Sequence, residues 1–107
     1  MAFIGELAAL SWVNFHAVSS VGIRDDYNVS SITDNGTGDF WVNFTNNMAN
    51  TTYCALGTVA ESSSDPNRYA SLFHSFATNR YRVCSNFPSH TREDCELYCY
   101  AVFGDPT

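Results

Sequence analysis

The segment Val21–Met48 reads VGIRDDYNVSSITDNGTGDFWVNFTNNM and indicates the fold class of the chain. It divides into a strand pattern, a break and a second strand pattern, and the break is Asp34–Asp39, DNGTGD. Glycine adopts positive φ without steric cost, and Asn and Asp side chains hydrogen-bond to nearby backbone groups. The segment therefore predicts a β-hairpin with its turn at Asp34–Asp39.

The same alternation of strand and turn signals continues on both sides of this hairpin. Strand patterns recur every eight to twelve residues, which is typical of an all-β sandwich or barrel. The expected strands lie near 11–18, 20–25, 27–33, 39–45, 51–60, 69–76, 79–85 and 94–103. The sequence thus predicts one antiparallel β-sandwich of about eight short strands over residues 12–107. Only the first ten residues show helical periodicity, and residues 1–11 are expected to form a short helix or an arm.

Composition limits the classes of function. The chain has 107 residues, of which 45% are hydrophobic, 15% aromatic and 15% charged, a balance typical of a folded domain. The formal net charge of −6 repels phosphate backbones, so nucleic-acid binding is not expected. Met1–Leu10 contains Glu6 and no basic residue, so we expect neither a secretory signal nor a membrane span there.

Signatures of catalysis and metal binding are scarce, so no enzyme activity, cofactor or metal is expected. The sequence has no Gly-x-Ser-x-Gly, phosphate-binding loop or His-Glu-x-x-His pattern. Cys95 and Cys99 lie four residues apart on an expected strand, about 13 Å from each other, which is too far for a disulfide. All four cysteines are expected to be small buried hydrophobic residues.

A repeated tetrapeptide suggests which strand faces are buried. Trp12–Phe15 and Trp41–Phe44 both read WVNF. Alternation places Val13, Phe15 and Ala17 on one face of the first strand, and Phe40, Val42 and Phe44 on one face of the second; these are the expected core. The tryptophans then point outward. On the last strand, Cys95, Leu97, Cys99, Ala101 and Phe103 share one face, and Tyr98, Tyr100 and Val102 are expected on the outward face. Because Trp and Tyr are enriched at interfaces, we expect a subunit interface at Trp12, Trp41, Tyr98 and Tyr100.

The run Ile23–Phe40, IRDDYNVSSITDNGTGDF, resembles a module of tail-fibre and other virion structural proteins of marine and cyanobacterial bacteriophages. The end of the last strand, Cys99–Gly104, CYAVFG, is similar to a CxAxFG-like pattern of that family. The resemblance implies a jelly-roll-like, trimeric β structure on the virion surface, made in the host cytoplasm, with phage capsid or tail proteins as partners.

Two locations on the particle fit this resemblance. A capsid decoration or cement protein would dock through its N-terminal arm, with Phe3, Ile4 and Leu7 as the docking residues. A tail-fibre or tip component would present loops to a host glycan or protein, with the candidate binding residues Ser63, Asp65, Asn67, His90 and Arg92. The alternative from another class is a free, lectin-like β-sandwich, in which Trp12 or Trp41 stacks on a sugar ring. A glycan-cleaving enzyme is the weakest hypothesis, because no pair of residues supplies the chemistry.

Overall fold

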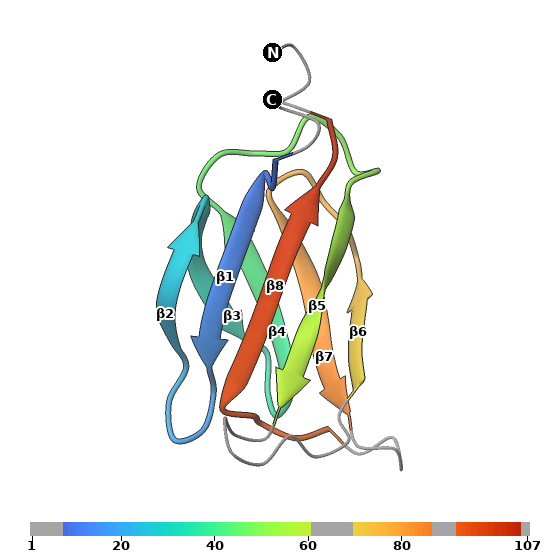
Figure 1. Cartoon of the computed structure of the whole chain (residues 1–107). Helices are drawn as coiled ribbons and strands as arrows, with labels where there is room; N and C mark the ends of the chain where they lie inside the picture. Colours follow the sequence, from blue (N-terminus) through green and yellow to red (C-terminus); the bar gives the residue numbers. More distant parts are fainter. Residues whose placement is uncertain (1–7, 61–69, 87–91, 106–107) are drawn as a thin grey trace.

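The computed structural model describes residues 8–60, 70–86 and 92–105. They form two four-stranded antiparallel sheets that pack face to face (Figure 1). The first sheet has the strand order β2-β1-β8-β5 and the second has the order β3-β4-β7-β6. The strands are β1 (Ser11–His16), β2 (Gly22–Tyr27), β3 (Val29–Asp34), β4 (Asp39–Phe44), β5 (Cys54–Ala60), β6 (Ala70–His74), β7 (Arg80–Asn86) and β8 (Leu97–Phe103).

Each strand overlaps one of the eight strands expected from the sequence, and the prediction of an antiparallel all-β sandwich is confirmed. The predicted N-terminal helix or arm lies mostly outside the described residues, and residues 8–10 form no helix. Strands close in sequence are not always neighbours in space. β1 and β8 are adjacent in the centre of the first sheet, so the two ends of the described chain lie side by side (Figure 1).

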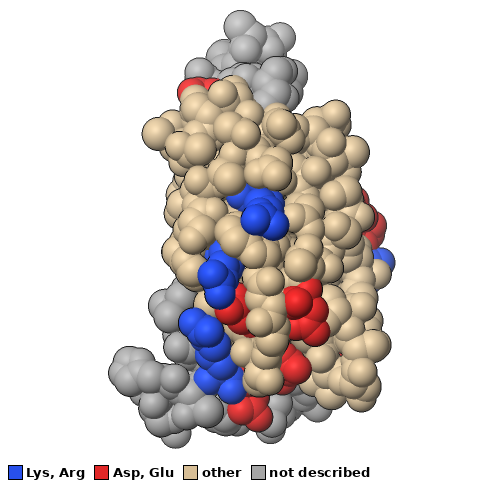
Figure 2. All heavy atoms as spheres, turned by 180° about the vertical axis from the view of Figure 1, so that it is seen from behind, with Lys and Arg blue, Asp and Glu red and all other residues tan. Residues whose placement is uncertain are grey.

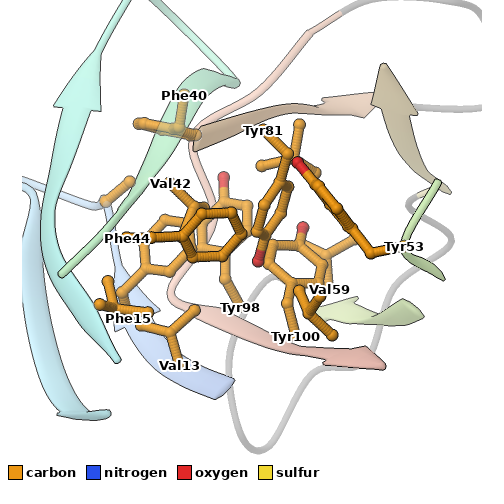
Figure 3. Close-up of a cluster of buried hydrophobic side chains, with 14 of the residues drawn as sticks. Val13, Phe15, Phe40, Val42, Phe44, Tyr53, Val59, Tyr81, Tyr98 and Tyr100 are labelled. Atoms are coloured by element: carbon orange, nitrogen blue, oxygen red, sulfur yellow. The ribbon is translucent and has the colours of Figure 1, made fainter. Parts of the chain in front are cut away.

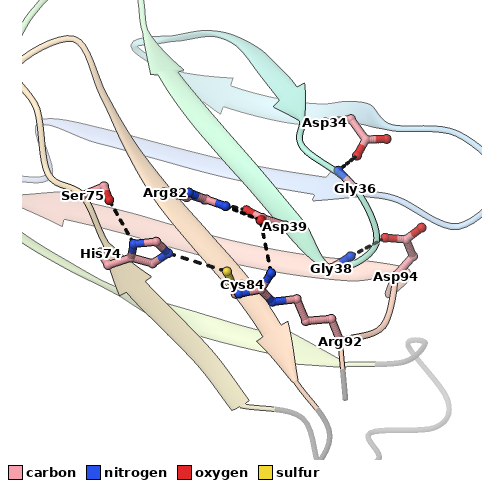
Figure 4. A network of polar contacts seen from close by, with 10 residues as sticks. All are labelled: Asp34, Gly36, Gly38, Asp39, His74, Ser75, Arg82, Cys84, Arg92 and Asp94. Carbon is pink, nitrogen blue, oxygen red and sulfur yellow. Dashed lines mark hydrogen bonds and ion pairs between the residues drawn. The ribbon is translucent and has the colours of Figure 1, made fainter. Parts of the chain in front are cut away.

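The predicted hairpin turn at Asp34–Asp39 connects β3 to β4. Gly36 and Gly38 both have positive φ, at 123° and 63°. The Asp34 carboxylate accepts a hydrogen bond from the Gly36 N–H at 2.8 Å, as expected for an Asx turn. A β carbon at position 38 would lie 2.7 Å from the carbonyl oxygen of Glu93, so only glycine lets the turn approach that segment. The Gly38 N–H also donates to Asp94 Oδ1 at 2.8 Å (Figure 4).

Asn28 forms the corner at which the chain leaves the first sheet and enters the second. Its φ of 56° is left-handed, a conformation that Asn tolerates better than most residues. Its side chain accepts a hydrogen bond from the Asn46 N–H at 2.7 Å and donates to the carbonyls of Leu10 and Asn46. One amide side chain thus connects three segments and fixes how the edges of the two sheets meet.

The core lies between the sheets and is rich in aromatic rings (Figure 3). The rings of Phe15 and Tyr98 are stacked, with centroids 4.5 Å apart, and Phe40 contacts both edge-on. Such contacts add about 0.5–1.5 kcal/mol per pair beyond the burial of apolar area. The six residues expected in the core from the repeated WVNF pattern are all buried: Val13, Phe15, Ala17, Phe40, Val42 and Phe44.

The faces of β8 were predicted the wrong way round. Tyr98, Tyr100 and Val102 point into the core and are at most 3% exposed, whereas Leu97, Cys99, Ala101 and Phe103 are only partly buried. The tyrosine hydroxyls have partners inside the sandwich. Tyr98 Oη lies 2.9 Å from Ser85 Oγ and accepts from the Cys95 N–H, and Tyr100 Oη lies 3.1 Å from Ser71 Oγ. Because these hydrogen bonds satisfy the hydroxyls, burial of both rings is favourable.

Candidate functional site

The outer face of the first sheet carries a row of large apolar side chains. The strand registers place Tyr27 opposite Trp12, Trp12 opposite Ala101, and Ala101 opposite Leu56. Paired residues of antiparallel strands point to the same side of the sheet, so these four form one line across all four strands. Tyr27 is 55% exposed, Trp12 is 38% exposed and Leu56 is 50% exposed. We call Tyr27, Trp12, Ala101 and Leu56 the apolar row.

A shallow hollow of about 340 Å³ interrupts the apolar row between Trp12 and Leu56. The residue between these two large side chains is Ala101, which has only a methyl group, and Gly57 also lines the hollow. Cys99 and Asn14 line the hollow on the adjoining row. An apolar depression flanked by two half-exposed large side chains is suited to receive an apolar group of another molecule.

Trp41 lies on the other side of the molecule, on the outer face of the second sheet. The guanidinium carbon of Arg80 is 3.7 Å from the centroid of the Trp41 ring, and that of Arg82 is 5.8 Å away. Cation–π contacts of this kind hold the arginine flat on the ring. Trp12 and Trp41 therefore do not belong to one surface, and a subunit interface that uses Trp12 leaves Trp41 on the opposite side.

Tyr98 and Tyr100 do not belong to a subunit interface. Both are fully buried within the sandwich, so the prediction of an interface role for them is wrong. Their places on the outer face of the first sheet are taken by Tyr27 and Leu56, which sequence reasoning missed. The sequence does contain a hint for Leu56. A large apolar residue there is followed by Gly57, so the core-facing position of β5 next to Leu56 has no side chain and the regular alternation of apolar and polar residues is broken. Tyr27 had none, since its position depends on the pairing of β1 with β2.

A charged cluster lies at the end of the second sheet nearest the Asp34–Asp39 turn (Figure 4). Arg82 Nε donates to Asp39 Oδ1 at 2.8 Å, Arg82 Nη2 donates to Asp39 Oδ2, and Arg92 Nη1 lies 3.4 Å from Asp39 Oδ2. The hydrogen bond from Arg82 is the main reason that the pKa of Asp39 is lowered, although burial of the carboxylate acts in the opposite direction. This cluster is a structural ion-pair network that fixes the hairpin turn to β7.

The cluster also includes a thiol and an imidazole. Cys84 Sγ lies 3.7 Å from His74 Nε2, and His74 Nδ1 is 3.0 Å from Ser75 Oγ (Figure 4). Cys84 is 1% exposed, and burial raises the pKa of its thiol. A reactive cysteine needs a lowered pKa and access to solvent, so this pair does not form a nucleophilic site.

The other cysteines divide into two environments. The prediction of burial is confirmed for Cys84 and Cys95, but Cys54 is exposed and Cys99 is only partly buried. Within the described residues, no group of three or more Cys, His, Asp or Glu side chains is arranged to hold a metal ion. In the same part of the chain, no helix is long and apolar enough to cross a membrane.

Most of the predicted docking and loop residues fall outside the described part of the chain. These are Phe3, Ile4 and Leu7 of the N-terminal segment, and Ser63, Asp65, Asn67 and His90 of the two loops. Arg92 is described and is exposed, with its guanidinium directed towards Asp39. Its observed contact is structural, and its predicted role in binding stays a prediction.

Comparisons of the chain with protein-family models, with curated proteins and with solved structures found no match. The two outer faces of the sandwich are therefore the features of the structure that bear on function.

Proposed function

We propose that this chain is a non-enzymatic structural module of a bacteriophage particle that assembles into a homotrimer through the apolar row. The observation that carries the proposal is the alignment of Tyr27, Trp12 and Leu56 across the outer face of the first sheet. Large exposed apolar patches on soluble proteins mark interaction sites, and this row places two exposed aromatic side chains, Trp12 and Tyr27, directly opposite each other. The trimeric number and the jelly-roll-like class follow from the resemblance to phage modules.

The chemistry of the row is that of a protein interface. Trp and Tyr are enriched at interface hot spots, and Trp12 lies beside a hollow that a large side chain of a neighbouring subunit would fill. Asp25 lies opposite Asn14 in the adjoining row on the same face, so charge borders the row but does not interrupt it. The ion pair Arg24–Glu96, at 2.7 Å, joins β2 to the segment before β8 and would belong to the polar rim of such an interface.

Two positions on the particle agree with a small trimeric module. A capsid decoration protein would sit where three capsid subunits meet and would stabilise the shell. A tail-fibre or tip component would sit at the end of the tail and would contribute to attachment. Both positions need a rigid β trimer with one covered face and one outward face, which is the arrangement that the two unlike faces of this sandwich support.

Immunogold electron microscopy of intact particles tests the proposal and separates the two positions. An antibody against this chain that labels the heads evenly would identify a decoration protein, whose removal should lower particle stability. Labelling at the tail end would identify an adhesion component, whose removal should lower adsorption. Absence of gold label from both the heads and the tails of intact particles would overturn the proposal.

A free lectin-like module is the second candidate, and it is favoured by Trp12. This ring is half-exposed beside an apolar hollow, with Asn14 nearby as a polar partner, as in a site where a sugar stacks on an aromatic ring. Trp41 is less suited to that role, since Arg80 covers one face of its ring. A glycan array would support this candidate if the monomer bound one neutral glycan and Trp12→Ala abolished the binding.

A further inference from the structure

The outer face of the second sheet differs in kind from the apolar row. All five basic residues of the chain are arginines, and Arg80, Arg82 and Arg92 lie on or beside β7. Figure 2 shows basic side chains in a column on this side of the molecule, with acidic side chains near the lower part of the column. In a chain with a net charge of −6, this concentration of arginine on one face needs an explanation.

Arg80 is the arginine of this face that lacks an acidic partner. Asp39 is paired with Arg82 and Arg92, but no carboxylate of the described residues lies within ion-pair distance of Arg80. The register places Asp39 opposite Cys84 and Asn43 opposite Arg80. The strand positions of Asp39 and Arg80 are therefore four residues apart along β4. At 3.3 Å per residue this separation is about 13 Å, which is beyond the Debye length at physiological salt. The charge of Arg80 is therefore available to a ligand.

The Trp41 ring fixes the orientation of the Arg80 guanidinium. At 3.7 Å from the ring centroid the guanidinium lies against the aromatic face, which restricts the long side chain before any ligand arrives. A planar guanidinium presents several N–H donors to a carboxylate or sulfate group. Because its position is already fixed, less conformational entropy is lost on binding.

A row of hydroxyl donors continues from Arg80 across the sheet. Asn43 lies opposite Arg80, and Ser31 lies opposite Asn43. Asn43 Nδ2 donates to Ser31 Oγ at 3.1 Å and to Thr33 Oγ1 at 2.9 Å. Since both hydroxyl oxygens already accept a hydrogen bond, their O–H groups remain to donate, and in the described residues they have no acceptor. Arg80, Ser31 and Thr33 therefore form a surface that offers donors to an acceptor-rich ligand.

We propose that this surface binds an acidic polysaccharide, with the carboxylate or sulfate group of one sugar unit on Arg80 and the ring and hydroxyl oxygens of the next unit on Ser31 and Thr33. The row spans two strand spacings, or about 10 Å, so it suits neighbouring units of a sugar chain. Nucleic acid fits less well, because one cation beside two neutral hydroxyl donors matches the ring and hydroxyl oxygens of a sugar chain better than a phosphate backbone. The inference goes beyond the proposed trimer and does not depend on it.

The test uses the full chain with alginate and dextran sulfate as acidic probes, neutral dextran as a control polymer and a poly-dT oligonucleotide as the competing polyanion. We expect both acidic polysaccharides to bind more tightly than dextran and the oligonucleotide. Arg80→Gln should weaken that binding about tenfold or more, as expected for loss of a hydrogen bond to a charged group. The matched control is Arg24→Gln, which removes one arginine from the first sheet and should change the affinity less than about twofold.

A second variant keeps the test decisive if Arg80→Gln lowers stability. Asn43→Ala removes the group that orients both hydroxyls and leaves the charge unchanged, so it should weaken polysaccharide binding severalfold. The proposal is overturned if neither acidic polysaccharide binds, if dextran binds equally well, or if the oligonucleotide binds as tightly. It is also overturned if Arg24→Gln weakens binding as much as Arg80→Gln, because the effect would then be one of net charge.

Discussion

Gly57 lies directly opposite Tyr100 across β5 and β8, and the Tyr100 ring occupies the space that a side chain at position 57 would fill. A β carbon at position 57 would lie 2.4 Å from Tyr100 Cδ1 and 2.0 Å from the carbonyl oxygen of Cys99. An aromatic ring that packs over a glycine in the neighbouring strand stabilises a position that would otherwise weaken the sheet. The buried position of Tyr100 thus depends on Gly57.

Gly57→Ala is therefore expected to destabilise the fold by about 1–3 kcal/mol, because the ring and the β8 backbone must both move. Chemical denaturation followed by tryptophan fluorescence measures this change. Gly22→Ala is the matched control in the same sheet. Its β carbon would meet only the end of the His16 side chain, which can move away, so its effect should stay below about 1 kcal/mol. Equal effects of the two variants would contradict the close packing of Tyr100 on Gly57.

Tyr98→Phe tests the buried hydrogen bonds that let the tyrosines of β8 face inward. The variant keeps the ring stacked on Phe15 but removes the hydroxyl that accepts from the Cys95 N–H and contacts Ser85 Oγ. Loss of a buried partner should cost about 1–3 kcal/mol of unfolding free energy. Tyr27→Phe makes the same chemical change at a side chain that is 55% exposed, and it should leave the stability of the monomer unchanged. If Tyr98→Phe has the same unfolding free energy as the wild type, these hydrogen bonds contribute little to stability.

Asp39→Asn tests the ion-pair network at the hairpin turn. Removing the charge leaves Arg82 and Arg92 without their carboxylate, and we expect a loss of about 1–3 kcal/mol at neutral pH. The pKa of Asp39 is lowered in the folded state, so its contribution is fully present above the ordinary carboxyl pKa of 3.8 and is lost as the pH falls through the lower, folded value. Thermal unfolding at a series of pH values should show the difference between wild type and variant shrinking below about pH 4. A difference that does not change with pH would mean that the charge of Asp39 is not what stabilises the turn.

The strands and the hairpin turn were predictable because they depend on local chemistry. Asp34–Asp39 contains its own turn residues, and Phe40, Val42 and Phe44 alternate with polar neighbours. β8 was predicted with its faces reversed, because both of its faces carry apolar residues and alternation alone does not say which face is buried. The hydroxyl partners of Tyr98 and Tyr100 are Ser85 and Ser71, which belong to the other sheet and are far away in the sequence. The contact of Arg80 with Trp41 likewise depends on the pairing of β4 with β7.

Leu56→Asp tests the assembly face. Leu56 points away from the core and is 50% exposed, so the substitution should change the stability of the monomer by less than about 0.5 kcal/mol. In a trimer it would bury a charge beside the hollow next to Trp12, and we expect the variant to dissociate into monomers. Val18→Asp is the control, since Val18 is 43% exposed in the connection between β1 and β2, outside the apolar row. It should assemble like the wild type, and equal dissociation of both variants would contradict the assignment of the row.

The most direct test of the proposed assembly is the mass of the purified wild-type protein in solution, measured by size-exclusion chromatography with light scattering over a range of concentrations. We expect a single species with three times the mass of the chain. A species with the mass of one chain at every concentration would contradict assembly through the apolar row. Trp12, Tyr27 and Leu56 would then be exposed for contact with a different molecule.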